Sequence, residues 1–280
     1  MKQQEIDLDF SRRQVMAIVN VTPDSFFAGS RTPDWLAIEH RVRDAVGAGA
    51  SIIDVGGYSS RPGADEVPPE EEWRRVDLGI GAVRALSPEI PVSVDTFRSS
   101  VAVRAIRKYG KVIVNDISAG ELDPLLVDVA AEYDVPYIAM HMKGDPRTMQ
   151  LLADYRDIVA EVVDYFRVRT AQLRERGVRR IVVDPGFGFA KTLDQNYELL
   201  RGLHRLAELG YPVLAGVSRK SMIYKLLDTT PAEALNGTTA LHWECLRQGA
   251  AILRVHDTRE AVEVVRLFDR YMEAGWNARR

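Results

Sequence analysis

Residues 180–184 read RIVVD, an apolar run of β-branched side chains that ends in an aspartate. A short run rich in Val and Ile is typical of a strand that is buried on both faces, as in a parallel sheet. Seven more runs of this kind are MAIVN at 16–20, SIIDVGG at 51–57, PVSVD at 91–95, KVIVND at 111–116, PYIAMHM at 136–142, PVLAGVSRK at 212–220 and AAILRVHD at 250–257. Eight such strands predict a closed parallel barrel.

The spacing of the runs supports this prediction. The 280 residues shared among eight runs leave 35 residues for each unit, enough for a strand, two loops and a crossover helix. Helical periodicity occurs at 35–48, 70–86, 99–108, 123–133, 155–176, 196–209, 232–248 and 259–271. Glycines that end helices precede the next strand at Gly49, Gly110, Gly177, Gly210 and Gly249. The sequence therefore predicts an α/β fold, a single (β/α)8 TIM barrel over residues 1–280 with a core at about 14–273.

Composition excludes several classes of protein. With 46% hydrophobic and 28% charged residues, the chain is typical of an ordinary soluble globular protein, and it is long enough for one large core. No apolar run reaches the roughly 18 residues that span a bilayer, and the first residues lack an apolar signal core, so we expect a cytoplasmic protein without membrane partners. The net charge of −3 and the absence of a basic run argue against nucleic-acid binding. The single cysteine, Cys245, is expected to be a packed core thiol.

Polar side chains end most of the predicted strands. In such barrels the active site lies at the carboxyl ends of the strands, so these side chains should line one pocket. They are Asn20, Asp95, Asn115, Asp184, Lys220, Arg254 and His256. Taken singly, each could instead cap a helix or pair with a neighbouring charge. Seven together indicate a binding site.

The residue types indicate an anionic ligand joined to a flat heterocycle. Arg61, Arg254 and His256 supply donors for a phosphate or diphosphate, and the amide oxygen of Asn20 suits the magnesium that accompanies diphosphate. Asp95, Asn115 and Asp184 offer acceptors and an amide for a flat ring with several nitrogens and an amino group. Lys220 offers a donor for a carbonyl oxygen of the same ring.

Eight motifs in order resemble the dihydropteroate synthase family, the folate-pathway enzymes that sulfonamides target. They are NVTPDSF at 20–26, SRPG at 60–63, VDT at 94–96, VND at 114–116, HMKGDPRTMQ at 141–150, DPGFGF at 184–189, GVSRKS at 216–221 and RVHD at 254–257. The resemblance extends from Met16 to about Phe268.

This resemblance implies the family's substrates and reaction: 6-hydroxymethyl-7,8-dihydropterin diphosphate and 4-aminobenzoate give 7,8-dihydropteroate and diphosphate. The residues implied to bind pterin and diphosphate are Asn20, Ser60, Arg61, Asp95, Asn115, Met140, Asp184, Lys220, Arg254 and His256. Those implied to be catalytic are Asp95, Lys220, Arg254 and His256. Asn20 is implied to lie near Mg²⁺, the expected cofactor, and aminobenzoate is implied to contact Phe187, Phe189 and Ser218. The family's habit of pairing through its last helices implies a homodimer.

Two long connections, at 22–34 and 58–69, contain prolines and glycine and are expected to be mobile loops after the first and second strands. In the family these loops close over the diphosphate, which excludes water. The second loop departs from the common pattern at Tyr58 and at Ser60, where threonine is usual, and the first is reduced to AGSR at 28–31. Such changes could alter the packing of the loops and the affinity for aminobenzoate.

Three alternatives stay open on the sequence. A pterin-dependent methyltransferase barrel would share the Asp and Asn pocket, but GVSRKS and NVTPDSF disfavour it. A catalytically silent pterin-binding paralogue would not need all of the polar residues retained here. A Schiff-base aldolase would need a lysine inside a strand, whereas Lys220 follows its strand.

Overall fold

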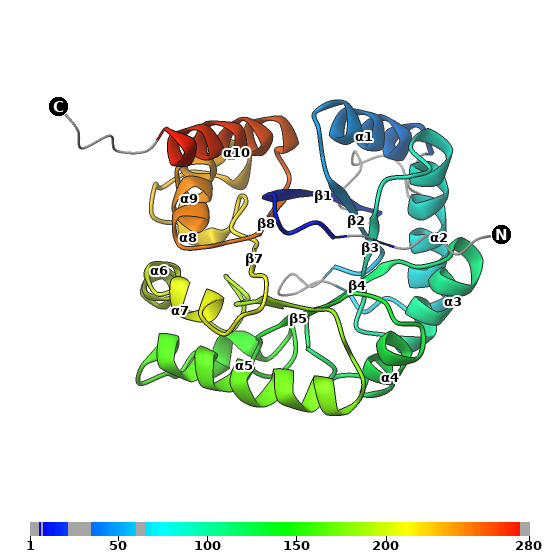
Figure 1. Ribbon diagram of the computed structural model, residues 1–280, viewed down its shortest axis with the longest axis horizontal. Coiled ribbons are helices and arrows are strands. Elements are labelled where there is room, and N and C mark those ends of the chain that lie inside the picture. The colour runs from blue at the N-terminus through cyan, green and yellow to red at the C-terminus, as the bar shows by residue number, and fades with distance from the viewer. Residues whose placement is uncertain (1–5, 7, 22–34, 60–64, 275–280) are drawn as a thin grey trace.

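Eight parallel strands form one sheet that curves round on itself in the computed structural model, which describes residues 6, 8–21, 35–59 and 65–274 (Figure 1). The strands are β1 (Gln14–Asn20), β2 (Ile52–Gly56), β3 (Val92–Asp95), β4 (Ile113–Asp116), β5 (Tyr137–Met140), β6 (Ile181–Asp184), β7 (Leu214–Ala215) and β8 (Ile252–Val255). Their order is β6-β5-β4-β3-β2-β1-β8-β7. A parallel bridge between Val183 and Val213 joins β6 to the residue before β7, the two strands at the ends of this order. The predicted barrel is therefore confirmed.

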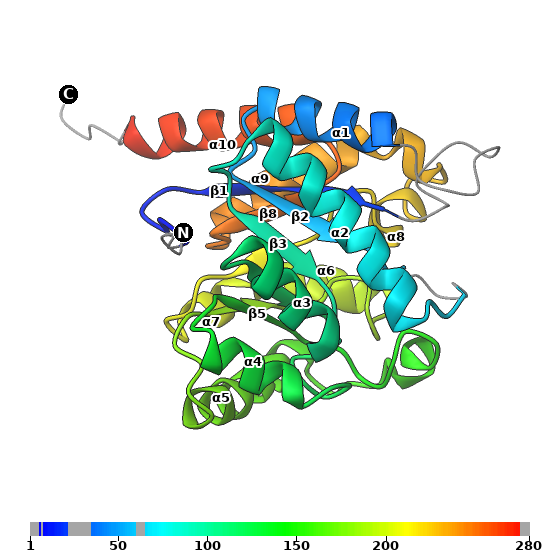
Figure 2. The same cartoon turned by 90° about the vertical axis from the view of Figure 1, so that its right-hand side faces the viewer.

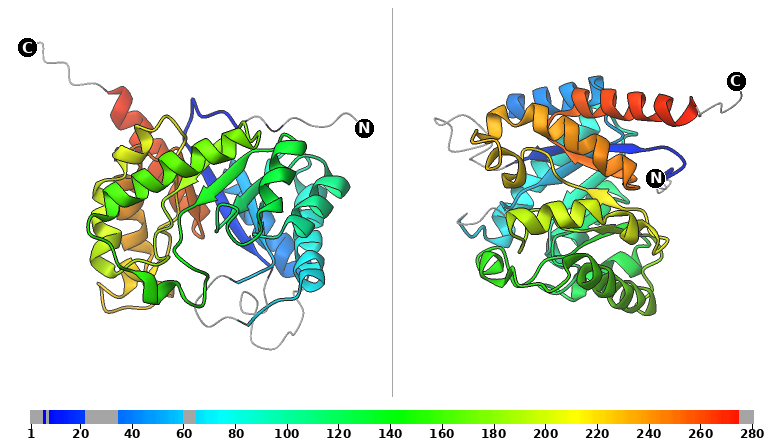
Figure 3. Two further views of the ribbon diagram at one scale, coloured as in Figure 1. Left: turned by 90° about the horizontal axis from the view of Figure 1, so that it is seen from below. Right: turned by 90° about the vertical axis from the view of Figure 1, so that its left-hand side faces the viewer.

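Helices cover the outer side of the barrel, and α1 to α4 follow one another around it (Figure 2). The α-helices are α1 (Trp35–Gly47), α2 (Pro69–Leu86), α3 (Ser99–Tyr109), α4 (Leu125–Glu132), α5 (Ile158–Glu175), α6 (Leu193–Arg201), α7 (His204–Ala207), α8 (Ser221–Tyr224), α9 (Leu235–Arg247) and α10 (Thr258–Glu273). Two 3₁₀ turns, η2 (Met149–Leu152) and η3 (Pro231–Glu233), lie in connections. Figure 3 shows the same helical layer from below and from the opposite side.

The predicted helices are found with shifts of a few residues, with one exception. The segment 196–209 was predicted to be one helix, but α6 ends at Arg201 and α7 begins at His204. Between them, a Cβ on Gly202 would lie 2.6 Å from Val159 on α5. The break between α6 and α7 thus lies where the chain packs closely on α5. The short helix α8 was not predicted.

The apolar residues form separate layers that follow the alternation of each strand. The main core packs the outer faces of the strands against the helices. A second cluster takes one residue from each of seven strands: Met16, Ile52, Ile113, Ile138, Val182, Leu214 and Ile252. On β4, Asn115 lies two residues after Ile113 and so on the same face. The apolar layer therefore lies beneath the polar residues that end the strands.

Two expectations about composition can be compared with the structure. Cys245 is fully buried, and burial raises the pKa of its thiol, which confirms a packed core residue. No helix within the described residues is long and apolar enough to cross a membrane.

Candidate active site

Arg254 lies at the centre of the polar cluster inside the barrel. From β8 its Nε donates to Asp54 Oδ2 at 2.7 Å, and its Nη2 donates to Asp95 Oδ2 at 2.6 Å. Strand β1 lies between β8 and β2 in the sheet, so only side chains that point inward can meet in this way. Burial disfavours the guanidinium charge, but the two carboxylates outweigh it and raise the pKa of Arg254.

Asp54 is a central residue that the sequence left open: before Gly56 and Gly57 it could orient the pocket or the second loop, or the double glycine could simply permit a tight turn. Its carboxylate is fully buried on β2 and accepts hydrogen bonds from Arg254 and from Asn115 Nδ2, the latter at 3.3 and 3.4 Å. The available signal was a carboxylate in the middle of the apolar run SIIDVGG. Because that run alternates like the others, the position of Asp54 implies an inward side chain.

Asn20 and Asp95 are the last residues of β1 and β3, on either side of β2. A Cβ on Gly56 would lie 3.1 Å from Asn20 Oδ1 and 3.6 Å from Asp95 Oδ2, so both side chains face the space over this glycine. Burial raises the pKa of Asp95 to about 7, opposed by Arg254 and reinforced by Asp54.

Lys220 and Asp184 form the opposite wall. Lys220 Nζ donates to the carbonyl of Phe187 and lies 4.7 Å from the centre of the Phe189 ring. Burial lowers the pKa of Lys220 to about 8, with Asp184 opposing the shift. Burial also raises the pKa of Asp184, whose Oδ1 accepts the Gly186 N–H at 2.8 Å.

An apolar cluster lies beside the polar one at the mouth of the barrel. Met140 and Phe189 belong to it, together with Ile117, Met142, Met149, Ala190 and Phe97. Phe187 does not, because its ring is fully buried in the main core and only its carbonyl reaches Lys220. Of the two phenylalanines expected to contact aminobenzoate, only Phe189 therefore has its ring at the mouth.

The remaining predicted residues lie at the ends of β7 and β8 or outside the described residues. Ser218 Oγ accepts the backbone N–H of His256 at 3.1 Å and lies 3.1 Å from His256 Nδ1. Ser60 and Arg61 lie outside the described residues, as do all of the first predicted mobile loop and the centre of the second.

A buried lysine beneath the mouth was not predicted. Lys191 Nζ donates to the carbonyls of Gly186 and Phe189 at 3.0 and 2.8 Å, and lies 3.1 Å from His141 Nδ1. Burial lowers the pKa of His141 to about 2, so the ring is neutral and its Nδ1 can accept from the lysine. Lys191 and His141 thus hold the turn that carries Phe189.

The same turn depends on Gly186, which has a φ of 68°. A Cβ there would lie 2.1 Å from the carbonyl oxygen of His141. We expect Gly186→Ala to lower the free energy of unfolding by roughly 3 kcal/mol, from the left-handed backbone and the overlap together. Urea unfolding measures this, with Gly47→Ala as the control because a Cβ at Gly47 meets nothing within 4 Å. Equal stabilities of the two variants would contradict the assignment of strain to Gly186.

The part of the chain that the structure describes contains no magnesium cage of protein carboxylates. Among the described residues, no group of three or more His, Cys, Asp or Glu side chains could hold a metal ion. Asn20 contributes a single amide oxygen beside the cluster. This donor set fits Mg²⁺ only where substrate phosphates and water supply the other ligands, which is how this ion is commonly bound.

The chain is similar to known proteins in both sequence and structure. Residues 16–256 match the family model described as pterin binding enzyme. The dihydropteroate synthase of Escherichia coli strain K12 is 42% identical over 280 residues, covering 99% of this chain and 98% of that protein.

Two solved structures of Xanthomonas albilineans dihydropteroate synthase have the same fold. One, with 4-aminobenzoic acid, has a TM-score of 0.85 and 39% identity, and covers 94% of each chain. The other, with 7,8-dihydropteroate, has a TM-score of 0.82 and 36% identity, and covers 95% of each chain.

Proposed function

Because the chain belongs to the dihydropteroate synthase family of pterin-binding enzymes, we propose that it condenses 6-hydroxymethyl-7,8-dihydropterin diphosphate with 4-aminobenzoate. The products are 7,8-dihydropteroate and diphosphate. One observation carries the proposal for this chain: Arg254 bridges Asp54 and Asp95 inside the barrel, with Lys220 and Asp184 on the facing wall. Such a site offers carboxylate acceptors for the pterin ring and cationic side chains for the diphosphate, as a pterin diphosphate requires.

The pterin ring is proposed to lie between Asn115, Asp184 and Lys220. A carboxylate can accept from the amino group and the ring N–H of the pterin, and the lysine can donate to its carbonyl oxygen. Met140 provides an apolar surface for the flat ring. Burial of Asn115 and Asp184, which are 4% and 7% exposed, makes each unmade hydrogen bond costly, so the pocket should select strongly for this heterocycle.

The diphosphate is proposed to bind at Arg254, His256 and Asn20, with Ser60 and Arg61 from the second loop. The described hydrogen bonds of Arg254 start from Nε and Nη2, so the Nη1 edge and the planar faces can contact a ligand. Asn20 would hold Mg²⁺ together with the diphosphate oxygens, and the bound ion would neutralise charge on the leaving group.

Asp95 is proposed to stabilise the reacting carbon. In the reaction, the bond between the pterin methylene carbon and the diphosphate oxygen breaks, and its electron pair leaves with diphosphate. The methylene carbon gains positive charge, which an ionised Asp95 would stabilise in a site shielded from water. The aminobenzoate nitrogen then bonds to this carbon and loses a proton. Phe189 and Ser218 are proposed to position the aromatic amine.

The pH dependence should show both titrating groups of the site. Asp95, with a raised pKa of about 7, is a carboxylate only above that pH, whereas Lys220, with a lowered pKa of about 8, is charged only below it. We therefore expect kcat/KM for the pterin substrate to fall below about pH 7 and above about pH 8, because this quantity reports groups of the free enzyme. A rate profile that stays flat through this range would contradict these assignments.

The test of the function is diphosphate release by the purified chain with dihydropterin diphosphate and Mg²⁺, with and without 4-aminobenzoate. The proposal predicts release that depends on aminobenzoate. If the pterin binds but no diphosphate is released, the chain is a silent pterin-binding paralogue. If the chain instead transfers a methyl group from a methylated tetrahydropterin to a corrinoid in a separate assay, it is a methyltransferase.

We also propose that the chain forms a homodimer and works in the cytoplasm. Exposed apolar side chains on α10, Leu267, Tyr271 and Met272, support a contact through the last helices. Sedimentation of the purified chain measures the oligomeric state.

A further inference from the structure

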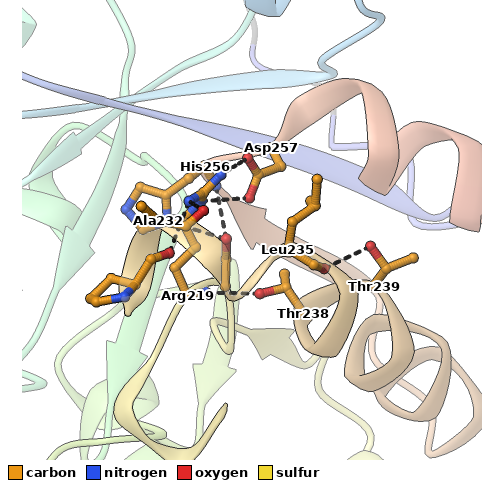
Figure 4. A network of polar contacts seen from close by, with 9 residues as sticks. Arg219, Ala232, Leu235, Thr238, Thr239, His256 and Asp257 are labelled. Carbon is orange, nitrogen blue, oxygen red and sulfur yellow. Dashed lines mark hydrogen bonds and ion pairs between the residues drawn. The ribbon is translucent and has the colours of Figure 1, made fainter. Parts of the chain in front are cut away.

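Arg219 makes a network of hydrogen bonds beside the proposed diphosphate site (Figure 4). Its Nε and Nη2 donate to Asp257 Oδ2 and Oδ1 at 2.9 and 2.7 Å, which is a bidentate pair. Its Nη1 donates to the carbonyls of Pro231 and Ala232 at 2.8 and 2.7 Å. The side chains of Arg219 and Asp257 are only 26% and 14% exposed, so solvent screens this pair less than a surface pair.

Asp257 occupies the position at which a carboxylate usually caps a helix. It is the residue before α10, yet its side chain makes no hydrogen bond to the first turn of that helix. An aspartate there normally accepts a backbone N–H of the first turn, which stabilises the helix. Both carboxylate oxygens are instead used by Arg219. The pair is thus formed at the expense of a local interaction.

The backbone of Arg219 is also held in an unfavourable conformation. Its φ is 54°, in the left-handed region that residues with a side chain rarely adopt. The N–H of Arg219 donates to Thr238 Oγ1 at 3.0 Å, and Thr238 is fully buried on α9. Strained backbone that is fixed from several sides is concentrated at functional sites, where it sets the direction of neighbouring side chains.

A second link runs parallel to the first, one residue earlier on each segment. Ser218 bonds to His256, and Arg219 bonds to Asp257, so the segment after β7 is fastened to the end of β8 twice. The first segment continues into Lys220, and the second follows Arg254, at the ends of the neighbouring strands β7 and β8.

We propose that Arg219 is a positioning residue, which through Asp257 fixes the spacing between Lys220 and the diphosphate-binding end of β8. This inference rests on the proposed function. Because the amine must reach a carbon from which diphosphate is leaving, a displacement of about 1 Å between the ends of β7 and β8 can reduce the rate about a hundredfold. Arg219 itself need not touch either substrate.

The test uses the full-length chain and the variants Arg219→Gln, Arg219→Lys and Asp257→Asn. We expect Arg219→Gln to weaken binding of inorganic diphosphate with Mg²⁺ about tenfold and to lower kcat by about ten- to a hundredfold. Binding of the pterin alcohol, which lacks the diphosphate, should be unchanged. Arg219→Lys keeps the charge but loses the planar fork, so it should be as defective as Arg219→Gln.

The double variant Arg219→Gln with Asp257→Asn should be no worse than Arg219→Gln alone, because both changes break the same link. Arg247→Gln is the matched control, since Arg247 makes a bidentate pair with Glu244 at 2.7 Å but is 59% exposed on α9. It should retain wild-type values.

The inference is overturned if Arg219→Gln and Asp257→Asn lower the melting temperature but leave diphosphate affinity and kcat at wild-type values. It is also overturned if Arg219→Lys restores both. The binding measurements do not need turnover. Failure of the proposed function, seen as a wild-type chain that makes no dihydropteroate, is therefore distinct from failure of this inference.

Discussion

Arg254→Ala is expected to lower kcat/KM by at least about a thousandfold, the largest effect of any single substitution in the site. The change removes the cation proposed to bind diphosphate, and it leaves Asp54 and Asp95 facing each other without their shared partner. Breaking a buried ion pair by removing one partner costs about 3–5 kcal/mol of stability. Protonation of Asp95 should relieve part of this cost, because its pKa is already raised to about 7.

Steady-state kinetics and thermal unfolding measure the two effects separately. Arg254→Lys keeps a charge but cannot donate to both carboxylates through a planar fork, so it should recover only part of the rate. Arg167→Ala is the control, since Arg167 pairs with Asp164 on an exposed helix face and its loss should change stability by less than about 1 kcal/mol. A folded Arg254→Ala enzyme with near-normal kcat/KM would exclude Arg254 from the diphosphate site.

Asp95→Asn is expected to lower kcat about a hundred- to a thousandfold, with much smaller changes in substrate binding. Asparagine has nearly the same shape, and its oxygen can still accept from Arg254 Nη2. The substitution therefore removes mainly the negative charge that is proposed to stabilise the reacting carbon. The fall of kcat/KM below about pH 7 should disappear in the same variant.

Asp116→Asn is the control for this second prediction. Asp116 is a fully buried carboxylate at the end of the adjacent β4, but it accepts from Ser118, Gly120 and Tyr137 and caps the following turn. Its loss should lower the melting temperature and leave kcat unchanged. If Asp95→Asn loses binding and kcat equally, Asp95 is a binding residue and does not act on the transition state.

The barrel was predictable because each strand is a short apolar run with β-branched residues. Alternation within these runs determines which residues point inward, and that is enough to bring together Asp95, Asn115, Asp184 and Arg254. The division of the segment 196–209 into α6 and α7 was not predictable. It coincides with the close approach of Val159 to Gly202, a contact between residues far apart in the sequence.

Within the site, the residues that were missed or left open are those whose roles depend on partners in space. The sequence allowed Asp54 either to orient the pocket or to precede a simple turn, and its hydrogen bonds to Arg254 and Asn115 support the first interpretation. Lys191 lies in a loop with no periodic pattern. Phe187 and Phe189 look equivalent in the sequence, but the positive φ of the intervening Gly188, 82°, turns the chain so that only the second ring reaches the mouth.

The most direct test of the central claim is the identity of the product made with ring-deuterated 4-aminobenzoate. The purified chain is incubated with dihydropterin diphosphate and Mg²⁺, and the product is analysed by mass spectrometry. Condensation at the barrel mouth predicts 7,8-dihydropteroate that carries the full deuterium label, with diphosphate formed in equal amount. Release of diphosphate with only the unlabelled pterin alcohol as product would show hydrolysis in place of amine transfer, and would contradict the account.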